Sequence, residues 1–352
     1  MKKLFRSAAV LALAAALLVS LTACGKEQET QPETEEPGQE APATLRVGAL
    51  KGPTAMGLVE LMKASDLVSA GEEVPQAYDN LPDAVDSYTF TLAAAATELA
   101  PQLVKGDLDI ACVPANLAAT LYQQTEGEVV TLGINTLGVL YIVENGNAVQ
   151  SLADLEGKTM VASGKDSTPE DALRYLLEEN GVDPDTGVVI DWKNEHSECV
   201  SALASGAATI ALLPQPFVTV AESKMPELRT ALDLTEQWDA LDNGSALITG
   251  VVVARRDVVE AHPQAVERFL EQYAASVDWV NANTADAAAL IGEYGIVDAA
   301  VAEKALPACN IVCITGSEMK EKLSGYLQVL CDASADSVGG AMPGDDFYYG
   351  AE

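Results

Sequence analysis

The residues with the clearest capacity for chemistry stand where an apolar strand pattern gives way to a helical one. In GALKGPTAMGLVELM (residues 48–62), Lys51, Gly52, Pro53 and Thr54 occupy that point. The first turn of a helix exposes unpaired backbone N–H groups and the positive end of the helix dipole, which favour an anion or a polar ligand. The same residues also make an ordinary helix start with Thr54 as N-cap. The turn alone leaves both interpretations open.

Side chains of the usual catalytic kinds are scarce. The chain has only two histidines, and His196 stands between Glu195 and Glu198 in the run NEHSE. A surface helix start accounts for that run better than an acid–base site. Neither GxSxG nor HExxH occurs in the sequence. Carboxylate pairs are too common in so acidic a chain to identify a site, so no catalytic residue is predicted.

The cysteines do not form a metal-binding pattern. The six cysteines are Cys24, Cys112, Cys199, Cys309, Cys313 and Cys331. If Cys24 carries a lipid, five remain, and at least one has no partner within the chain. Cys309 and Cys313 are four residues apart, but no histidine is near either in sequence and no CxxC occurs. We therefore predict no metal site and no cofactor. Small buried hydrophobic side chains are expected in preference to disulfides.

Composition narrows the class of protein. The chain has 352 residues, enough for about two domains, and a formal net charge of −33 at pH 7. Such a charge argues against nucleic-acid binding and against docking on an anionic membrane through charge. Hydrophobic residues make up 49% and aromatic residues 5%, so the cores are expected to be rich in Ala, Val and Leu.

The N-terminus carries a targeting pattern. Residues 1–23 begin with the basic MKKLFR and continue with an apolar run too short for a comfortable membrane span. The run ends in LTAC, which resembles the bacterial lipobox, where Cys24 would receive a diacylglyceryl group after cleavage just before it. Order and spacing favour this over a plain secretory signal. Residues 24–44, rich in Glu, Gln, Pro and Thr, are predicted to be a disordered acidic tether.

The remainder alternates between strand and helix patterns. Strands are predicted at 45–50, 87–92, 108–113, 129–144, 158–163, 188–192, 208–214, 228–234, 245–256 and 310–314. Helices are predicted at 54–65, 97–105, 114–124, 167–181, 197–206, 215–223, 235–241, 263–283, 284–294, 298–306 and 315–331, with a short helix capped by Ser151 and Asp154. This alternation predicts an α/β architecture with largely parallel sheets.

The strand–helix units fall into two sets, connected by long apolar runs near 138–143 and 247–252. We expect two doubly wound sheets joined by a two-crossing hinge. Lobe 1 would comprise residues 45–140 plus 248–352, and lobe 2 residues 141–247. A cleft between such lobes is a preferred place for a ligand.

Several segments resemble a known family in order and spacing: LKGPTAMGLVELM, KGDLDIACVPANLAATLY, GVLYIVE, SLADLEGKT, GKDSTPEDALRYLLEENG and ALLPQPFVTVA. Together they are similar to the substrate-binding lipoproteins of ABC importers, in the nitrate/sulfonate/taurine and thiamine-precursor group. The resemblance covers about residues 45–335. It implies a type II periplasmic-binding-protein fold with hinged lobes, and it leaves the ligand open.

Four strand-to-helix turns would face the cleft, because ligands of doubly wound sheets lie beyond the carboxyl ends of the strands. They supply the predicted ligand-binding residues, which are Lys51, Gly52, Thr54, Asn116, Ser163, Lys165, Ser167, Thr168 and Gln215. Each also has a structural alternative as a surface, turn or capping residue. The ligand is expected to be small and polar, and to be held by helix N-termini and short side chains rather than by a basic cluster.

The sequence thus predicts a receptor that does no chemistry. We expect a monomeric solute-binding protein, tethered by lipid to the extracytoplasmic face of a bacterial cell membrane. It would close on a small molecule and deliver it to an ABC permease and its ATPase. The alternative is a surface-tethered sensor or enzyme that uses the same two-lobed fold.

Overall fold

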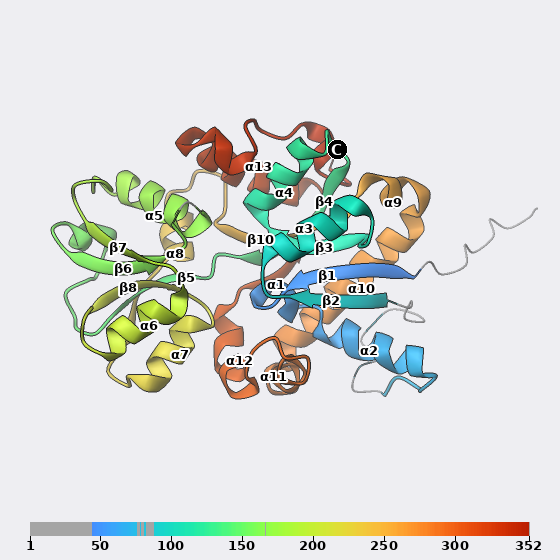
Figure 1. The fold of residues 1–352 in the computed structure, drawn as a ribbon, viewed down its shortest axis with the longest axis horizontal. Helices are drawn as coiled ribbons and strands as arrows, with labels where there is room; N and C mark the ends of the chain where they lie inside the picture. Colours follow the sequence, from blue (N-terminus) through green and yellow to red (C-terminus); the bar gives the residue numbers. More distant parts are fainter. Residues whose placement is uncertain (1–43, 76–77, 79–80, 82–87, 166, 352) are drawn as a thin grey trace, which may run out of the picture. The chain divides into compact units, whose positions relative to one another are not determined.

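The computed structural model describes residues 44–75, 78, 81, 88–165 and 167–351, and all of these belong to one compact unit. Two β-sheets form its framework (Figure 1). The predicted signal segment, Cys24 and the tether as far as residue 43 lie outside the described residues. Within the described part, no helix is long and apolar enough to span a membrane.

The first sheet has six strands in the order β11-β4-β10-β3-β1-β2. Their bounds are β1 Leu45–Leu50, β2 Tyr88–Ala93, β3 Ile110–Pro114, β4 Val129–Leu137, β10 Ile248–Arg255 and β11 Ile311–Ile314. Strand β1 pairs in parallel with β2 and β3, whereas β10 runs antiparallel to both β3 and β4. Strand β11 closes the sheet by pairing antiparallel with β4.

The second sheet has five strands in the order β7-β6-β8-β5-β9. They are β5 Leu140–Glu144, β6 Thr159–Ser163, β7 Val189–Lys193, β8 Ile210–Pro214 and β9 Arg229–Asp233. Strand β6 is parallel to β7 and β8, and β5 is antiparallel to β8 and β9. Both sheets are therefore mixed, because β5 and β10 enter their sheets from the crossing segments, at the edge where the parallel strands end.

Helices cover both faces of each sheet (Figure 1). Those beside the six-stranded sheet are α1 Pro53–Met56, α2 Val59–Ala70, α3 Ala96–Lys105, α4 Ala115–Gln124, α9 Arg256–Ala261, α10 Pro263–Ala282, α11 Thr284–Glu293, α12 Ala299–Ala305 and α13 Gly316–Ala333. Those beside the five-stranded sheet are α5 Thr168–Glu179, α6 His196–Ala204, α7 Phe217–Lys224 and α8 Leu234–Asp239. Short 3-10 turns occur at Leu152–Leu155, Leu306–Ala308, Ala335–Val338 and Asp345–Phe347.

The core of the five-stranded half follows the two-residue period of its strands. Ile142 of β5 belongs to one apolar cluster with Leu173 of α5 and Trp238 of α8. The next residue, Val143, belongs to another cluster with Val200 of α6 and Val218 of α7. Buried strands of this kind read as continuous apolar runs, which is why the strand patterns were visible in the sequence.

The predicted strand 129–144 is wrong as one element. It is two strands in different sheets, β4 and β5, separated at Gly138 and Val139. A Cβ on Gly138 would lie 2.3 Å from Thr235 Oγ1 and 2.8 Å from Leu247 Cδ2, so any side chain there would force one of these neighbours to shift. Leu247 immediately precedes β10, where the chain returns to the six-stranded sheet. The two crossing segments therefore lie against each other.

The predicted helix 54–65 is also two helices, α1 and α2, with a break at Gly57 and Leu58. Ser276 Oγ sits in the break, donating to Gly57 O at 2.8 Å and accepting from Leu61 N at 3.3 Å. The N-cap position of α1 is Gly52, at φ 136°. The interpretation of Thr54 as the N-cap is wrong, because its hydroxyl donates to Leu50 O at 3.0 Å.

Two other helices begin close to the positions predicted from the sequence. The capping box of Ser151 and Asp154 is confirmed. Ser167 occupies the N-cap position of α5, the first residue of the predicted helix 167–181, and its hydroxyl donates to Gly164 O at 2.7 Å. Helix α9 was not predicted, because its valine-rich sequence RDVVEA continues the apolar pattern of β10.

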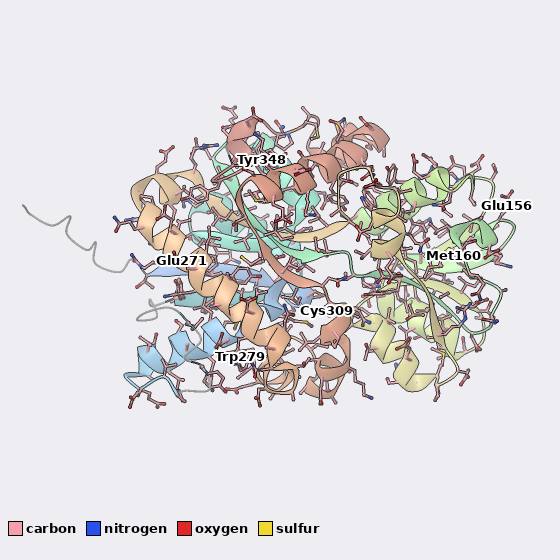
Figure 2. The ribbon with its side chains drawn as sticks, turned by 180° about the vertical axis from the view of Figure 1, so that it is seen from behind. Glu156, Met160, Glu271, Trp279, Cys309 and Tyr348 are labelled. Atoms are coloured by element: carbon pink, nitrogen blue, oxygen red, sulfur yellow. The ribbon has the colours of Figure 1, made fainter. Side chains whose placement is uncertain are left out.

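The C-terminal tail is bound to the six-stranded half. Tyr348 (Figure 2) forms an isolated bridge with Thr131 of β4, and Phe347 is fully buried. Asp346 accepts from Tyr122 at 2.7 Å and pairs with Arg256 at 2.8 Å. The tail thus completes the surface of this half instead of extending from it.

The cysteines in the described part are all unpaired. Cys112, Cys199 and Cys309 (Figure 2) are buried, as expected of small hydrophobic side chains, and Cys313 and Cys331 are partly buried. Burial raises the pKa of the Cys112 and Cys309 thiols to about 12, which keeps them protonated at neutral pH.

Candidate functional site

The topology brings the ends of strands from both sheets to one edge. Pro214, the last residue of β8, pairs with Leu140, the first residue of β5. Pro114, the last residue of β3, pairs with Gly250 near the start of β10. Because β5 and β10 both begin at the crossing segments, the carboxyl ends of β3 and β8 lie beside the crossing. This is the edge where doubly wound sheets bind ligands.

A cavity of about 440 Å³ lies at this edge. Its lining residues come from several strand-to-helix turns and from the crossing segment itself. They are Ala96, Pro114, Asn116, Leu117, Val139, Leu140, Gly164, Ser167, Thr168, Pro169, His196, Pro214 and Thr249. The volume falls within the usual range for small-molecule sites, about 300–1,000 Å³.

The five-stranded half supplies one set of polar lining residues. The β6–α5 turn contributes Gly164, Ser167 and Thr168, and the β7–α6 turn contributes His196. Helix α5 has 12 residues, long enough for a developed dipole. Pro169 has no N–H, and the N–H groups of Glu170 and Asp171 donate to Ser167 O at 2.9 and 3.2 Å, so Thr168 supplies the first-turn N–H that has no bond among the described residues. The arrangement is suited to an anionic or strongly polar group.

His196 is held in place by two contacts. Its Nδ1 lies 2.5 Å from the hydroxyl oxygen of Ser163, a side chain that is only 2% exposed. Its ring packs on Phe217, with centroids 5.0 Å apart and planes tilted by 49°. Burial lowers the pKa of His196 below its ordinary value of 6.5, so the imidazole is neutral at pH 7. With Nδ1 engaged by Ser163, Nε2 is the ring nitrogen left for a ligand.

A second cavity of about 390 Å³ adjoins the first and shares Gly164 and His196 with it. It is lined also by Ser163, Asn194, Glu195, Ser197 and Phe217. Glu195 is engaged there in capping its own helix, through a reciprocal capping box with Glu198.

The six-stranded half contributes neutral polar groups. Asn116 lies at the start of α4, and Thr249 lies in β10 next to Gly250. Among the described lining residues of the larger cavity there is no Lys, Arg, Asp or Glu, so His196 is the one ionisable side chain on that wall.

The structure brings together some of the predicted site residues and not others. Asn116, Ser167 and Thr168 line the larger cavity, and Ser163 lines the adjoining one. Lys51 and Lys165 are exposed and Gly52 is partly exposed, and none of the three is on either wall.

Two further predicted residues are buried and locally bonded. Thr54 donates to Leu50 O, and Gln215 Oε1 accepts from Thr219 Oγ1 at 3.0 Å. Gln215 is 6% exposed and Thr54 7% exposed, and neither is on the wall of either cavity.

Sequence reasoning missed seven lining residues, namely the apolar Leu117, Val139, Leu140 and Pro169 together with His196, Thr249 and Ala96. His196 and Ala96 each begin a helix that follows a parallel strand of its own sheet, β7 in the five-stranded sheet and β2 in the six-stranded sheet. The rule that selected the other turns applied equally to these two. Thr249 had no such signal, because it stands within a strand.

No group of three or more His, Cys, Asp or Glu side chains that could hold a metal ion occurs among the described residues. Within that part of the chain, the site therefore offers hydrogen-bond donors, a helix N-terminus and apolar surface, without a metal-ligand set.

Two α/β halves, joined by two crossings and sharing a cavity at their strand ends, define a solute-binding protein with the two-lobed periplasmic-binding-protein fold. The family model described as "ABC transporter, phosphonate, periplasmic substrate-binding protein" matches residues 86–305, more than half of the chain. The chain belongs to this family, whose members bind substrates outside the cytoplasm for ABC transporters. None of the curated proteins matches the sequence.

Solved structures share the fold. An ABC transporter protein from Parabacteroides distasonis is similar at TM-score 0.69 and 21% identity, covering 87% of this chain and 98% of that one. The periplasmic aliphatic sulphonate binding protein SsuA from Escherichia coli is similar at TM-score 0.64 and 16% identity, covering 84% and 88%. A cysteine-to-serine mutant of DszB, in complex with biphenyl-2-sulfinic acid, is similar at TM-score 0.60 and 14% identity, covering 87% and 96%.

Proposed function

We propose that this chain is the lipid-anchored receptor of an ABC importer, and that it captures a small organic molecule bearing a phosphonate or sulfonate group. The observation that carries the proposal is the cavity in which the N-terminus of α5, Ser167, Thr168 and His196 converge opposite Asn116. Phosphonate is the substrate in the family's description, and SsuA is described as binding an aliphatic sulphonate. Both groups present several acceptor oxygens on one tetrahedral centre.

The polar wall provides donors for such a group without a full positive charge. The N–H and the hydroxyl of Thr168 would donate to the oxygens, and the Ser167 hydroxyl would do so by exchanging its bond to Gly164 O for one to the ligand. When the Ser163 hydroxyl donates to His196 Nδ1, the ring proton is on Nε2, which then donates as well. The Asn116 amide would donate from the other half.

The remaining predicted contacts are proposed for the closed, liganded form. Lys51 and Lys165 have long, exposed side chains that can swing toward an anion, and Gly52 exposes backbone at the start of α1. Thr54 and Gln215 would contribute only by exchanging their present hydrogen bonds for bonds to the ligand.

Binding would act by closure of two lobes, residues 45–140 plus 248–352 and residues 141–247. The chain passes between the two sheets at Gly138 and again before Ile248, and these segments touch. A ligand that contacts both lobes binds the closed state better and shifts the population toward it. The permease and its ATPase would then receive the solute from a monomeric receptor tethered through Cys24.

A surface enzyme is the second candidate, because the contact between Ser163 and His196 pairs a hydroxyl with a base. Two features disfavour it. The Ser163 side chain is almost fully buried, and the hydroxyl engages Nδ1, so no described carboxylate orients the ring through that nitrogen, as a catalytic triad requires. We therefore propose binding without chemistry.

The test is calorimetry of the purified chain with methylphosphonate, methanesulfonate, acetate and a thiamine-precursor pyrimidine, together with native mass spectrometry of the unheated protein. Binding of the first two, with recovery of unaltered ligand, is expected. At a hundredfold excess over Kd the ligand would add about 2.7 kcal/mol to the free energy of unfolding, which appears as a rise in Tm. Binding of acetate or the pyrimidine alone would reject the oxyanion assignment, and conversion of the ligand would favour the enzyme.

A further inference from the structure

We infer that the molecule held in the larger cavity carries an apolar, uncharged organic substituent beside its oxyanion, and that ligands with an ammonium group in that place are disfavoured. This inference rests on the proposed function, because it concerns the rest of a molecule whose oxyanion binds at the polar wall. It selects among phosphonates and sulfonates.

Part of the apolar lining of the cavity lies at the crossing, where it consists of Val139, Leu140 and Pro214. Leu140 pairs with Pro214 across β5 and β8, and Gln215 N donates to Val139 O at 2.9 Å, which fixes Val139 beside them. Val139 and Leu140 are only 3% and 4% exposed, so the surface they present is packed and rigid.

The six-stranded half extends this apolar side. Pro114 ends β3, and Leu117 lies three residues further on, in the first turn of α4. Ala96 adds a small side chain from the start of α3. A buried methylene contributes about 0.8 kcal/mol, so each added CH₂ that contacts this surface is expected to tighten binding about fourfold.

The charged residues around the cavity also disfavour an ammonium group on the ligand. A buried ammonium needs a carboxylate or several acceptors to replace its water. The described lining of the larger cavity contains no Asp or Glu, while Asp166, between Gly164 and Ser167 in sequence, lies outside the described residues. Glu170 and Asp171, on the same helix as Thr168, line a different cavity together with Arg174. Glu195 lines the adjoining cavity and caps α6.

The volume leaves room for the substituent. The cavity of about 440 Å³ corresponds to roughly fifteen waters at ~30 Å³ each. A group with three oxygens on one centre replaces roughly four of them. The remaining volume, roughly eleven waters, is enough for a chain of several carbons.

The first experiment uses isosteric ligand pairs on the full mature chain, measured by calorimetry at one salt concentration. The pairs are propylphosphonate with 2-aminoethylphosphonate, and propanesulfonate with 2-aminoethanesulfonate. Affinity is expected to rise about fourfold per carbon from the methyl to the propyl compound, and the amino compound to bind at least tenfold more weakly than its propyl partner. An amino compound that binds as tightly as its partner would overturn the inference and leave the proposed function standing. Failure of every member to bind would overturn both.

The second experiment places a carboxylate on the apolar side. Leu117→Asp is expected to change the propyl-to-aminoethyl affinity ratio by at least tenfold in favour of the amino compound. Leu117→Asn, which adds polarity without charge, should change the ratio little. Gln124→Glu is the matched control, because it adds the same charge to the exposed end of the same helix. An unchanged ratio in a folded Leu117→Asp protein would contradict the inference, and if that variant does not fold, the ligand pairs decide alone.

Discussion

His196 offers the sharpest test of the site, because its position is fixed and its charge is expected to respond to the ligand. Burial lowers the pKa of this imidazole below 6.5, whereas an anion at Nε2 would raise it. Binding would then take up a proton in the window between these two pKa values. We expect affinity for a sulfonate to increase as the pH falls from 8 toward 5.5. The sulfonate is chosen because its own charge is constant across that range.

The size of the effect follows from a single charge-assisted hydrogen bond, which is worth about 1.5–3 kcal/mol. Replacing His196 with Ala should therefore weaken sulfonate binding about 10- to 150-fold at pH 6. His196→Gln keeps a neutral N–H donor at a similar reach, so it should recover part of the affinity at pH 8 and show a flat profile. Both variants keep the capping box of Glu195 and Glu198 that begins this helix.

Stability has the opposite pH dependence in the unliganded protein. A histidine whose pKa is lower in the folded state than in the unfolded state costs nothing at pH 8, where it is neutral in both. The cost appears as the pH falls below 6.5 and is complete below the folded pKa. Unliganded His196→Gln should therefore lose less stability than the unaltered protein between pH 7 and 5, measured by urea unfolding. Equal affinity profiles in the unaltered protein and in His196→Gln would refute the role assigned to this side chain.

Four other outcomes are expected. Replacing Cys24 with Ala should release the protein from membranes or leave the signal segment uncleaved; a membrane-bound variant with a mature N-terminus would contradict the lipid anchor. Asn116→Ala should weaken binding by about 1–3 kcal/mol, measured by calorimetry, because it leaves an unpaired group on the ligand; unchanged affinity would remove Asn116 from the site. Gly138→Ala should lower the free energy of unfolding by about 1–3 kcal/mol through the overlap with Thr235 and Leu247, and a Thr235→Ala background should restore part of this loss. X-ray scattering should show a smaller radius of gyration with saturating ligand, and no change would argue against closure.

The sequence identified most elements because their signals are local. Ser151 and Asp154 form the expected capping box, and α3 ends at Lys105, as the predicted helix 97–105 does, with Gly106 as its C-cap. The predicted strand 129–144 and the predicted helix 54–65 were each wrong as one element, because the contacts that divide them come from distant parts of the chain. The break at Gly57 depends on Ser276, more than two hundred residues away, and the change of sheet at Gly138 depends on contact with Thr235 and Leu247.

The site was predictable only in part for a similar reason. Asn116, Ser167 and Thr168 could be selected because each lies in or next to a turn that leads from a strand end into a helix. His196 was set aside because its neighbours Glu195 and Glu198 suggested a solvated helix start. Its role depends on the pairing of β6 with β7, which places Ser163 within hydrogen-bond distance. The sequence of β6 or of β7 alone does not predict that the two strands pair.

The order of strands along the chain has a consequence for how the protein folds as it is exported. The five-stranded sheet is built from one uninterrupted stretch, Leu140 to Asp233, so all its strands are present once that stretch has emerged. The six-stranded sheet waits longer, because β10 lies between β3 and β4 and is more than a hundred residues later in sequence than β4. Until β10 emerges, β4 has neither of its partners and β3 has one free edge. Unpaired apolar strand edges are templates for aggregation, so the interval between the emergence of β4 and β10 is the stage at which the nascent chain most needs a chaperone.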